Sequence, residues 1–350
     1  MKKRIAIVGA GALGGYVGGW FAHLGHDVTF IDPWPEHVEA IRARGLELDG
    51  VTPEEKVLVK NVKILHLTEL QALAKTPFDI AMVSMKSYDT AWSTALIAPY
   101  LAPEGYVVSL QNCLNEETIA GIVGWGRVVG VVASLISVDL HEPGRIRRTI
   151  AKGGDKHTVF RVGEPHGRVS ARVEELAGWL RGIDSAKTTT NLWGERWSKL
   201  VQNGMGNGVS AATGLSSADC ARNDTIRRFQ LALAGEGIRV GQALGYQLEK
   251  IRGLEPEQIA RANEGDAAAY ATIDAALKPA GANPRADIQR PSMAQDIRKG
   301  RRTEIDAMNG FVAAKGAQAG VPAASHTKLT QIVTRVERGE LKPSPSLLLG

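Results

Sequence analysis

The chain has little cysteine and no long block of charge of one sign. Its 350 residues include only two cysteines, Cys113 and Cys220, so no disulfide framework is readable, which is typical of a reducing cytoplasm. Lysine and arginine number 42 and acidic residues 37, and the resulting net charge of +5 is scattered along the chain. The short basic runs carry no interleaved aromatics, so we expect no nucleic-acid partner and favour a small anionic substrate.

Motifs that would identify other enzyme classes are also absent. The eight histidines include no His-Glu-x-x-His pair, and neither cysteine has a partner at ligand spacing, so we expect no metal site. The sequence contains neither a Gly-x-Ser-x-Gly turn nor a Walker loop. These absences argue against a metal hydrolase, an α/β-hydrolase and a P-loop nucleotidase.

The N-terminal segment imitates a signal peptide, because residues 2–4 are basic and residues 5–22 carry no charge. Six of those uncharged residues are glycines, and the segment runs directly into "GHDVTFID", which has the pattern of a strand. The glycines favour a turn and a packed helix. We therefore expect no membrane partner and a cytoplasmic location.

The first half of the chain alternates strands with helices. Residues 4–8 predict a strand, the following segment a helix to about Leu24, and residues 27–31 a second strand. Such alternation predicts a parallel sheet covered on both faces. Further strands are expected at 78–86 and 106–112, antiparallel additions at 127–140 and 157–164 with a turn at 141–144 between them, and helices at 89–101 and 169–182.

The second half loses strand character beyond the polar stretch at 187–191 and becomes alanine-rich with helical periodicity. The sequence therefore predicts two domains, residues 1–190 containing the parallel sheet and residues 191–350 forming a helical domain. Residues 265–289 predict a helix followed by an exposed loop.

The glycine pattern Gly9-x-Gly11-x-x-Gly14 follows the first strand and opens the first helix, which is the context that a dinucleotide-binding loop requires. The first glycine permits a tight turn, the second lets the backbone approach a pyrophosphate, and the third lets helix and strand pack closely. The helix N-terminus presents N–H groups to the anion. The candidate cofactor contacts of this loop are Gly9, Gly11, Ala12, Leu13 and Gly14.

Asp32 ends the second predicted strand, where a carboxylate accepts hydrogen bonds from an adenosine ribose and repels a 2′-phosphate. No lysine or arginine follows before Arg42, which favours NAD over NADP. The alternative is that Asp32 only starts the turn through Pro33 and Pro35.

Lys86 and Asn112 each stand at the carboxyl end of a predicted strand, the edge of an open sheet where ligands gather. We expect both side chains to face the cofactor. The alternative for each is a solvated residue that only ends its strand.

The segment "WSKLVQNGMGNGVSAATG" predicts a helix that holds Lys199, Asn203 and Asn207 four residues apart, on a stripe beside an apolar face. A solvated helix face is the alternative for such a stripe. Glycine inside a helix costs about 1 kcal/mol relative to alanine, so we expect a ligand or a neighbouring backbone to approach here. The apolar face comprises Trp193, Trp197 and Leu200, and the glycines are Gly204, Gly206 and Gly208.

Farther on, "PSMAQDIRKGRRTEIDAMNGF" contains Ser292 and Glu304. Thr303 and Asp306 have the spacing of a capping box for the helix that follows, which leaves Glu304 in its first turn.

These segments together, with "MKS" and "QNCLNEE", resemble in order and spacing the ketopantoate reductase (2-dehydropantoate 2-reductase) family over nearly the whole chain. The resemblance implies that residues 1–190 form a dinucleotide-binding Rossmann domain and residues 191–350 a helical substrate and catalytic domain, with catalysis in the cleft between them. It implies that Lys199 is the catalytic acid and that Glu304 assists at the substrate hydroxyl. It implies contacts to cofactor or substrate at Lys86, Asn112, Asn203, Asn207 and Ser292.

The chain departs from the family where Asp32-Pro33 stands in place of a basic residue and Cys113 in place of a glycine. The leading hypothesis is an NAD(P)-dependent reductase of a small 2-keto acid, with NAD preferred, NADP possible and Lys199 as general acid. One alternative is an NAD-dependent 2-hydroxyacid dehydrogenase acting on a bulkier or aromatic acid. Another is a non-catalytic dinucleotide sensor. We expect a homodimer, because helical second domains often pair.

Overall fold

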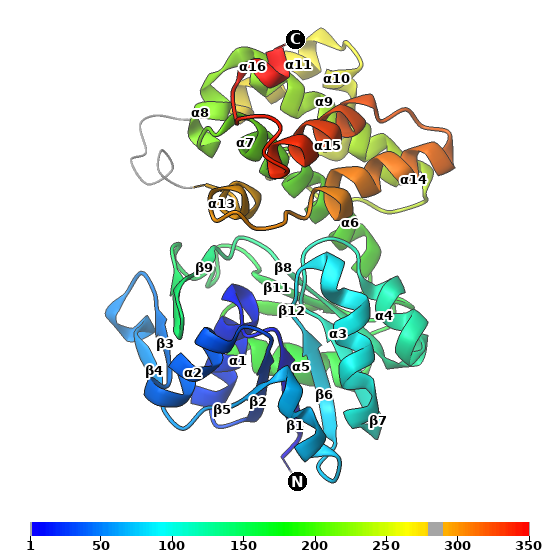
Figure 1. Ribbon diagram of the computed structural model, residues 1–350. Helices are drawn as coiled ribbons and strands as arrows, with labels where there is room; N and C mark the ends of the chain where they lie inside the picture. The colour runs from blue at the N-terminus through cyan, green and yellow to red at the C-terminus, as the bar shows by residue number, and fades with distance from the viewer. Residues whose placement is uncertain (1, 279–289, 350) are drawn as a thin grey trace. The chain divides into compact units, whose positions relative to one another are not determined.

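An eight-stranded sheet organises the first of two units, which comprises Met1–Leu192. Neighbouring strands are parallel, except that β8 and β11 are antiparallel. The chain builds outward from β1 in both directions, so the order reverses between β1 and β6 (Figure 1). In sheet order the strands are β12 (Ala186–Thr189), β11 (Phe160–Gly163), β8 (Val128–Ala133), β7 (Leu101–Ser109), β6 (Phe78–Val83), β1 (Arg4–Val8), β2 (Asp27–Asp32) and β5 (Lys63–His66).

The computed structural model describes residues 2–278 and 290–349. The predicted βαβ unit is confirmed, because β1, α1 and β2 follow one another with bounds within one residue of those expected. The first unit contains α1 (Ala12–His23), α2 (Pro35–Arg44), α3 (Thr90–Ile97), α4 (Glu116–Val123) and α5 (Ala171–Arg181). Short helical turns lie at η1 (Pro53–Glu55), η2 (Leu67–Leu73), η3 (Ser87–Asp89), η4 (Ala98–Tyr100) and η5 (Trp125–Arg127).

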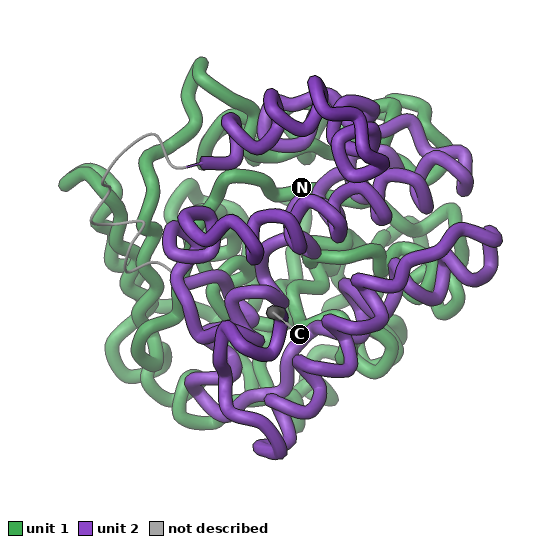
Figure 2. The backbone as a smooth tube through the Cα atoms, turned by 90° about the horizontal axis from the view of Figure 1, so that it is seen from above, with its two compact units in different colours: residues 1–192 green, residues 193–350 purple. Residues whose placement is uncertain are grey.

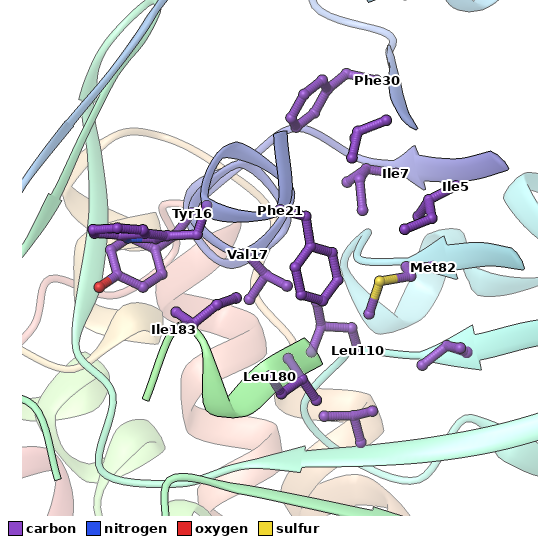
Figure 3. Close-up of a cluster of buried hydrophobic side chains, with 14 of the residues drawn as sticks. Ile5, Ile7, Tyr16, Val17, Phe21, Phe30, Met82, Leu110, Leu180 and Ile183 are labelled. Atoms are coloured by element: carbon purple, nitrogen blue, oxygen red, sulfur yellow. The ribbon is translucent and has the colours of Figure 1, made fainter. Parts of the chain in front are cut away.

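Side chains that alternate along β1 enter two different cores. Ile5 and Ile7 pack with α1 and α5 on one face of the sheet, whereas Ala6 and Val8 pack with α3 and α4 on the other. Figure 3 shows the first core, where Val17 and Phe21 of α1 point toward the end of α5. Successive side chains of a strand point to opposite faces of the sheet. Because both faces of β1 are covered, its sequence is apolar without interruption from Ile5 to Val8.

A second, four-stranded sheet lies against α1 on the side away from the main sheet (Figure 1). Its order is β4 (Val57–Val59), β3 (Leu46–Asp49), β10 (Arg145–Arg148) and β9 (Val138–Glu142). A Cβ atom on Gly18 would lie 2.7 Å from Ile7 of the main sheet, and one on Gly19 would lie 3.0 Å from Leu46 of the second sheet. The extra glycines therefore let one helix fit between two sheets.

Two expectations for the segment at 127–140 are wrong. Val128–Ala133 pairs parallel with β7, and Val138–Glu142 leaves the main sheet to form a hairpin with β10. The antiparallel addition expected at 157–164 is confirmed by β11. Periodicity did not reveal the direction of β8, because a buried parallel strand and a buried antiparallel strand share the same apolar pattern.

The second unit, Trp193–Gly350, is helical over its described residues, apart from one bridge between Ile251 and Leu254 (Figure 2). A helix is confirmed at Ala267–Leu277, whereas the loop expected after it falls largely on residues 279–289, outside the described part. No helix in the described ranges is long and apolar enough to cross a membrane. The helices are α6 (Leu192–Gly204), α7 (Asn207–Thr213), α8 (Ser217–Arg222), α9 (Asp224–Ala243), α10 (Pro256–Asn263), α11 (Ala267–Leu277), α13 (Ser292–Arg298), the π-helical turn η6 (Asp306–Gly310), α14 (Phe311–Ala319), α15 (Ala324–Glu337) and α16 (Ser346–Leu349).

Candidate functional site

The three glycines of the first loop have three different surroundings. Gly9 has a φ of +98°, and a Cβ there would lie 2.7 Å from Met85 Sδ. A Cβ on Gly14 would overlap the carbonyl oxygen of Gly9. Beside Gly11, by contrast, no heavy atom of the described residues lies within 4 Å of the place where a Cβ would stand. Gly9 and Gly14 thus close the turn, whereas Gly11 leaves open space in front of the backbone.

The open space at Gly11 adjoins the N-terminus of α1, whose first two residues are Ala12 and Leu13. Gly11 occupies the N-cap position and provides no side-chain hydrogen bond, and the first turn contains no acidic residue. Backbone N–H groups in the first turn of a helix have no partner within the helix and favour an anion. The loop therefore fits the pyrophosphate of a dinucleotide.

Asp32 binds the glycine loop directly. Its carboxylate accepts hydrogen bonds from the backbone N–H of Ala10 at 2.7 Å and from that of Trp34 at 2.9 Å. Burial raises the pKa of this carboxyl group, and the two backbone N–H donors oppose that rise. The bond to Trp34 confirms that Asp32 starts the following turn, and each oxygen keeps a lone pair for a further donor.

His37, on α2, supports the same loop and was missed from the sequence. The backbone N–H of Gly144 donates to its Nδ1 at 3.0 Å, so Nε2 carries the proton and donates to the carbonyl of Ala10 at 2.8 Å. The side chain is fully buried. A histidine in an amphipathic helix has no sequence pattern that would identify this bridge.

Lys86 and Asn112 follow neighbouring strands that end at one level, since Val83 pairs with Ser109. The carbonyl of Asn112 accepts from Ser87 Oγ at 3.4 Å and from Asn115 Nδ2 at 2.7 Å. The loops that carry Lys86 and Asn112 therefore adjoin. The loop of Lys86 also meets the glycine turn, through Ser84 and Met85.

The helix expected to run through Lys199, Asn203 and Asn207 is interrupted, which corrects the prediction of one continuous stripe. α6 ends at Gly204 and α7 begins at Asn207, and the N–H of Gly206 donates to the carbonyl of Asn203. The apolar face beside the stripe is confirmed at Trp197 and Leu200, which are buried, whereas Trp193 is half-buried. Trp197 Nε1 also donates to the carbonyl of Gly237 on α9 at 2.8 Å.

Contacts at this break explain one of its three glycines, Gly208. A Cβ on Gly208 would lie 2.9 Å from Leu329 Cδ2 and 3.2 Å from Ile305 Cδ1. The carbonyl of Gly204 accepts from Asn309 Nδ2 at 2.9 Å. A Cβ on Gly206 would meet no heavy atom of the described residues within 4 Å. Close packing within the unit therefore accounts for Gly208.

Glu304 and Ser292 lie on segments that border the break. Glu304 is buried and precedes Ile305, whose side chain faces Gly208. Ser292 is the first residue of α13, which packs against α7. The second unit thus brings the segments of Ser292 and Glu304 against those of Asn203 and Asn207.

The predicted capping box at Thr303 is wrong. Its hydroxyl donates to Glu337 at 2.6 Å and accepts from the N–H of Ile305 at 3.4 Å, not from Asp306. The helix that follows opens with a π-helical turn, which the capping pattern does not reveal.

Comparisons with known proteins agree with this geometry. Residues 5–160 match the family described as "Ketopantoate reductase PanE/ApbA", and residues 191–337 match its C-terminal family. A 2-dehydropantoate 2-reductase of Archaeoglobus fulgidus is 29% identical over 339 residues, covering 96% of this chain and 99% of that protein.

Two solved structures are similar to the chain over nearly its whole length. A PanE/ApbA family ketopantoate reductase from Ralstonia eutropha has a TM-score of 0.76 at 27% identity, covering 96% of this chain and 99% of its own. A D-mandelate dehydrogenase solved with NADH and anilino(oxo)acetate has a TM-score of 0.79 at 22% identity, covering 96% and 98%. At that lower identity the likeness shows the fold alone.

The glycine loop, the sheet and these matches define an oxidoreductase that uses a nicotinamide dinucleotide. Within that class, the chain belongs to the ketopantoate reductase family and is an NAD(P)-dependent reductase of that family.

Gly11→Ala tests the open space in the loop. The variant should fold like the wild type, because its methyl group meets no neighbour, but its dissociation constant for NADH should rise about tenfold or more as the backbone loses its approach to the pyrophosphate. Gly121→Ala, on α4 and equally open, is the matched control. NADH binding followed by fluorescence decides, and wild-type affinity in Gly11→Ala would contradict the assignment.

His326 predicts a pH dependence of stability. Burial lowers its pKa to about 4, so the neutral form is retained in the fold while the unfolded chain protonates near pH 6.5. Its contribution is complete above pH 6.5 and falls by about 1.4 kcal/mol per unit as the pH drops toward 4. Urea unfolding at pH 7 and pH 5 should show a loss larger by about 2 kcal/mol in the wild type than in His326→Gln. Equal losses in the two proteins would refute this origin.

Proposed function

We propose that the protein reduces a small 2-keto acid to the 2-hydroxy acid, with NADH as the preferred reductant. Two observations support the proposal most. One helical unit carries Lys199, Asn203 and Asn207 beside the segments of Ser292 and Glu304. The other unit has an open glycine loop. Family membership supports the same reaction class. A dinucleotide sensor without catalytic activity would not need these polar residues.

The two units have different tasks in this proposal. The glycine loop, Lys86 and Asn112 hold the dinucleotide, which supplies hydride to the carbonyl carbon when bound. The reaction also needs a proton for the developing alkoxide, and the Lys199 ammonium donates it. The same positive charge stabilises the oxyanion as it forms.

Neutral and acidic groups complete the chemistry. Asn203, Asn207 and Ser292 orient the substrate by hydrogen bonds, and Asn112 is available to either ligand. The Glu304 carboxylate keeps the ammonium of Lys199 populated and assists at the substrate hydroxyl.

Coenzyme choice rests on Asp32. Its negative charge ends β2 beside the loop, where it would repel a 2′-phosphate and accept hydrogen bonds from a ribose. The homodimer and the cytoplasmic location stay predictions.

A panel of 2-oxo acids assayed with both coenzymes tests the reaction and the coenzyme together. We expect oxidation of NADH by ketopantoate or a related small 2-oxo acid, with kcat/KM about tenfold or more above that for NADPH because of charge repulsion at Asp32. Phenylglyoxylate in the panel tests the aromatic alternative. Comparable rates with NADPH would refute the argument from Asp32, and turnover of no acid would refute the reaction.

Lys199→Ala should lower kcat about 100-fold or more while the dissociation constant for NADH stays within twofold, because the lost group acts on the alkoxide. Stopped-flow measurement of hydride transfer and equilibrium NADH binding separate the two effects. Lys199→Arg is the control for charge without an easily released proton. Full activity in Lys199→Ala would remove the mechanism.

A further inference from the structure

A buried polar chain crosses the second unit beneath the break between α6 and α7. His326 Nε2 lies 2.8 Å from the carbonyl of Leu233, and its Nδ1 lies 3.1 Å from Asn309 Nδ2. Asn309 Nδ2 also donates to the carbonyl of Gly204 at 2.9 Å. Four segments are joined in this way: α9, α15, η6 and the end of α6.

The direction of every bond in the chain is fixed by chemistry. The carbonyls at its two ends only accept, so His326 must carry its proton on Nε2, and Asn309 must present its amide nitrogen to Gly204. The second N–H of that nitrogen then meets the unprotonated Nδ1 of His326. Only one tautomer and one amide orientation satisfy all three contacts.

This buried polar chain has an energetic cost, so a contribution to stability alone does not explain it. Asn309 and His326 are both fully buried, and Asn309 Oδ1 has no hydrogen-bond partner within the described part of the chain. An unsatisfied buried oxygen is unfavourable, and well-packed apolar residues of similar volume are often at least as stable as buried polar groups. The arrangement therefore points to a required geometry.

The geometry in question is the helix break. In an uninterrupted helix, the carbonyl of Gly204 would accept from the N–H of Gly208. Here the polypeptide turns at Met205 and Gly206, and the N–H of Met205 donates to the carbonyl of Val201. The carbonyl of Gly204 accepts instead from the side chain of Asn309. Asn309 sits in the π-helical turn, and single π turns occur frequently at functional sites.

We propose that Asn309 and His326 are positioning residues that hold this break, and thereby set where Asn203 and Asn207 stand relative to Lys199. The inference rests on the proposed function for its link to turnover. The break itself is a matter of structure and is tested separately.

The decisive variants are Asn309→Leu and His326→Leu, which remove the donors and the acceptor at similar volume, and His326→Gln, which keeps a donor and an acceptor. Ile273→Ala is the control for lost stability, because Ile273 is fully buried in α11 and takes no part in the chain. The measurements are kcat and KM for the oxo acid, the dissociation constant for NADH, and amide hydrogen exchange at Asn207 and Gly208.

Both leucine variants should lose about tenfold or more in kcat, since small misplacements of positioning groups are costly, with NADH binding within twofold of wild type. The double leucine variant should lose no more than either single one, because the two residues act as a unit. His326→Gln should keep at least half of kcat. Exchange at Asn207 and Gly208 should change about tenfold in the leucine variants and remain unchanged in Ile273→Ala.

Wild-type kcat in Asn309→Leu, or an equal loss of kcat in Ile273→Ala, would overturn the proposal. If the wild-type protein reduces no oxo acid, the proposed function fails on its own, and exchange at Asn207 and Gly208 then decides whether Asn309 holds the break. Unchanged exchange in Asn309→Leu would overturn the inference in that case too.

Discussion

The first unit depends on the close approach of α1 to the strands beside it. Gly14 lies so near the carbonyl of Gly9 that no side chain fits, and Gly18 meets Phe30 and Ile7 in the same way. These contacts bring the start of the helix to the carboxyl edge of the sheet, at the place where the strand order reverses between β1 and β6. The exposed backbone at Gly11 exists because its neighbours in the loop are packed. Dinucleotide binding is thus a consequence of helix–sheet packing.

The second unit depends on a buried hydrogen bond, whereas the first depends on close packing without side chains. There a polar side chain, Asn309, donates to the carbonyl of Gly204, which the next helical turn would otherwise pair. The first unit gains its site by omitting side chains, whereas the second interrupts a helix and satisfies the freed carbonyl from a distant segment. The backbone at Gly11 is thus left open, whereas the carbonyl of Gly204 is paired with a buried side chain.

The sequence predicted the parts of the fold whose causes are local. The glycine spacing and the apolar run at Arg4–Val8 located β1, α1 and β2, because turn chemistry and burial act within a few residues. The second sheet escaped prediction, since its four strands are three to five residues long and its pairs join β3 to β10, far apart in the chain. The break after Gly204 escaped for the same reason: its partner, Asn309, is 105 residues away. Glycine content indicated a special place but not which carbonyl would need a donor.

The hydrogen bonds of Asp32 limit how coenzyme choice can be re-engineered or can drift in evolution. On the proposed role of Asp32, admitting the phosphorylated coenzyme calls for replacing the acid with arginine. Here that exchange would leave the buried amide of Ala10 without its acceptor, at a cost of about 1–3 kcal/mol, and would remove the acceptor of the half-buried Trp34 amide as well. A route that keeps both hydrogen bonds would leave the aspartate in place and introduce a lysine or arginine at a neighbouring strand end, such as the position of His66, which pairs with Asp32 in the sheet. The carboxylate that we propose to contact the ribose is therefore also a structural part of the glycine loop.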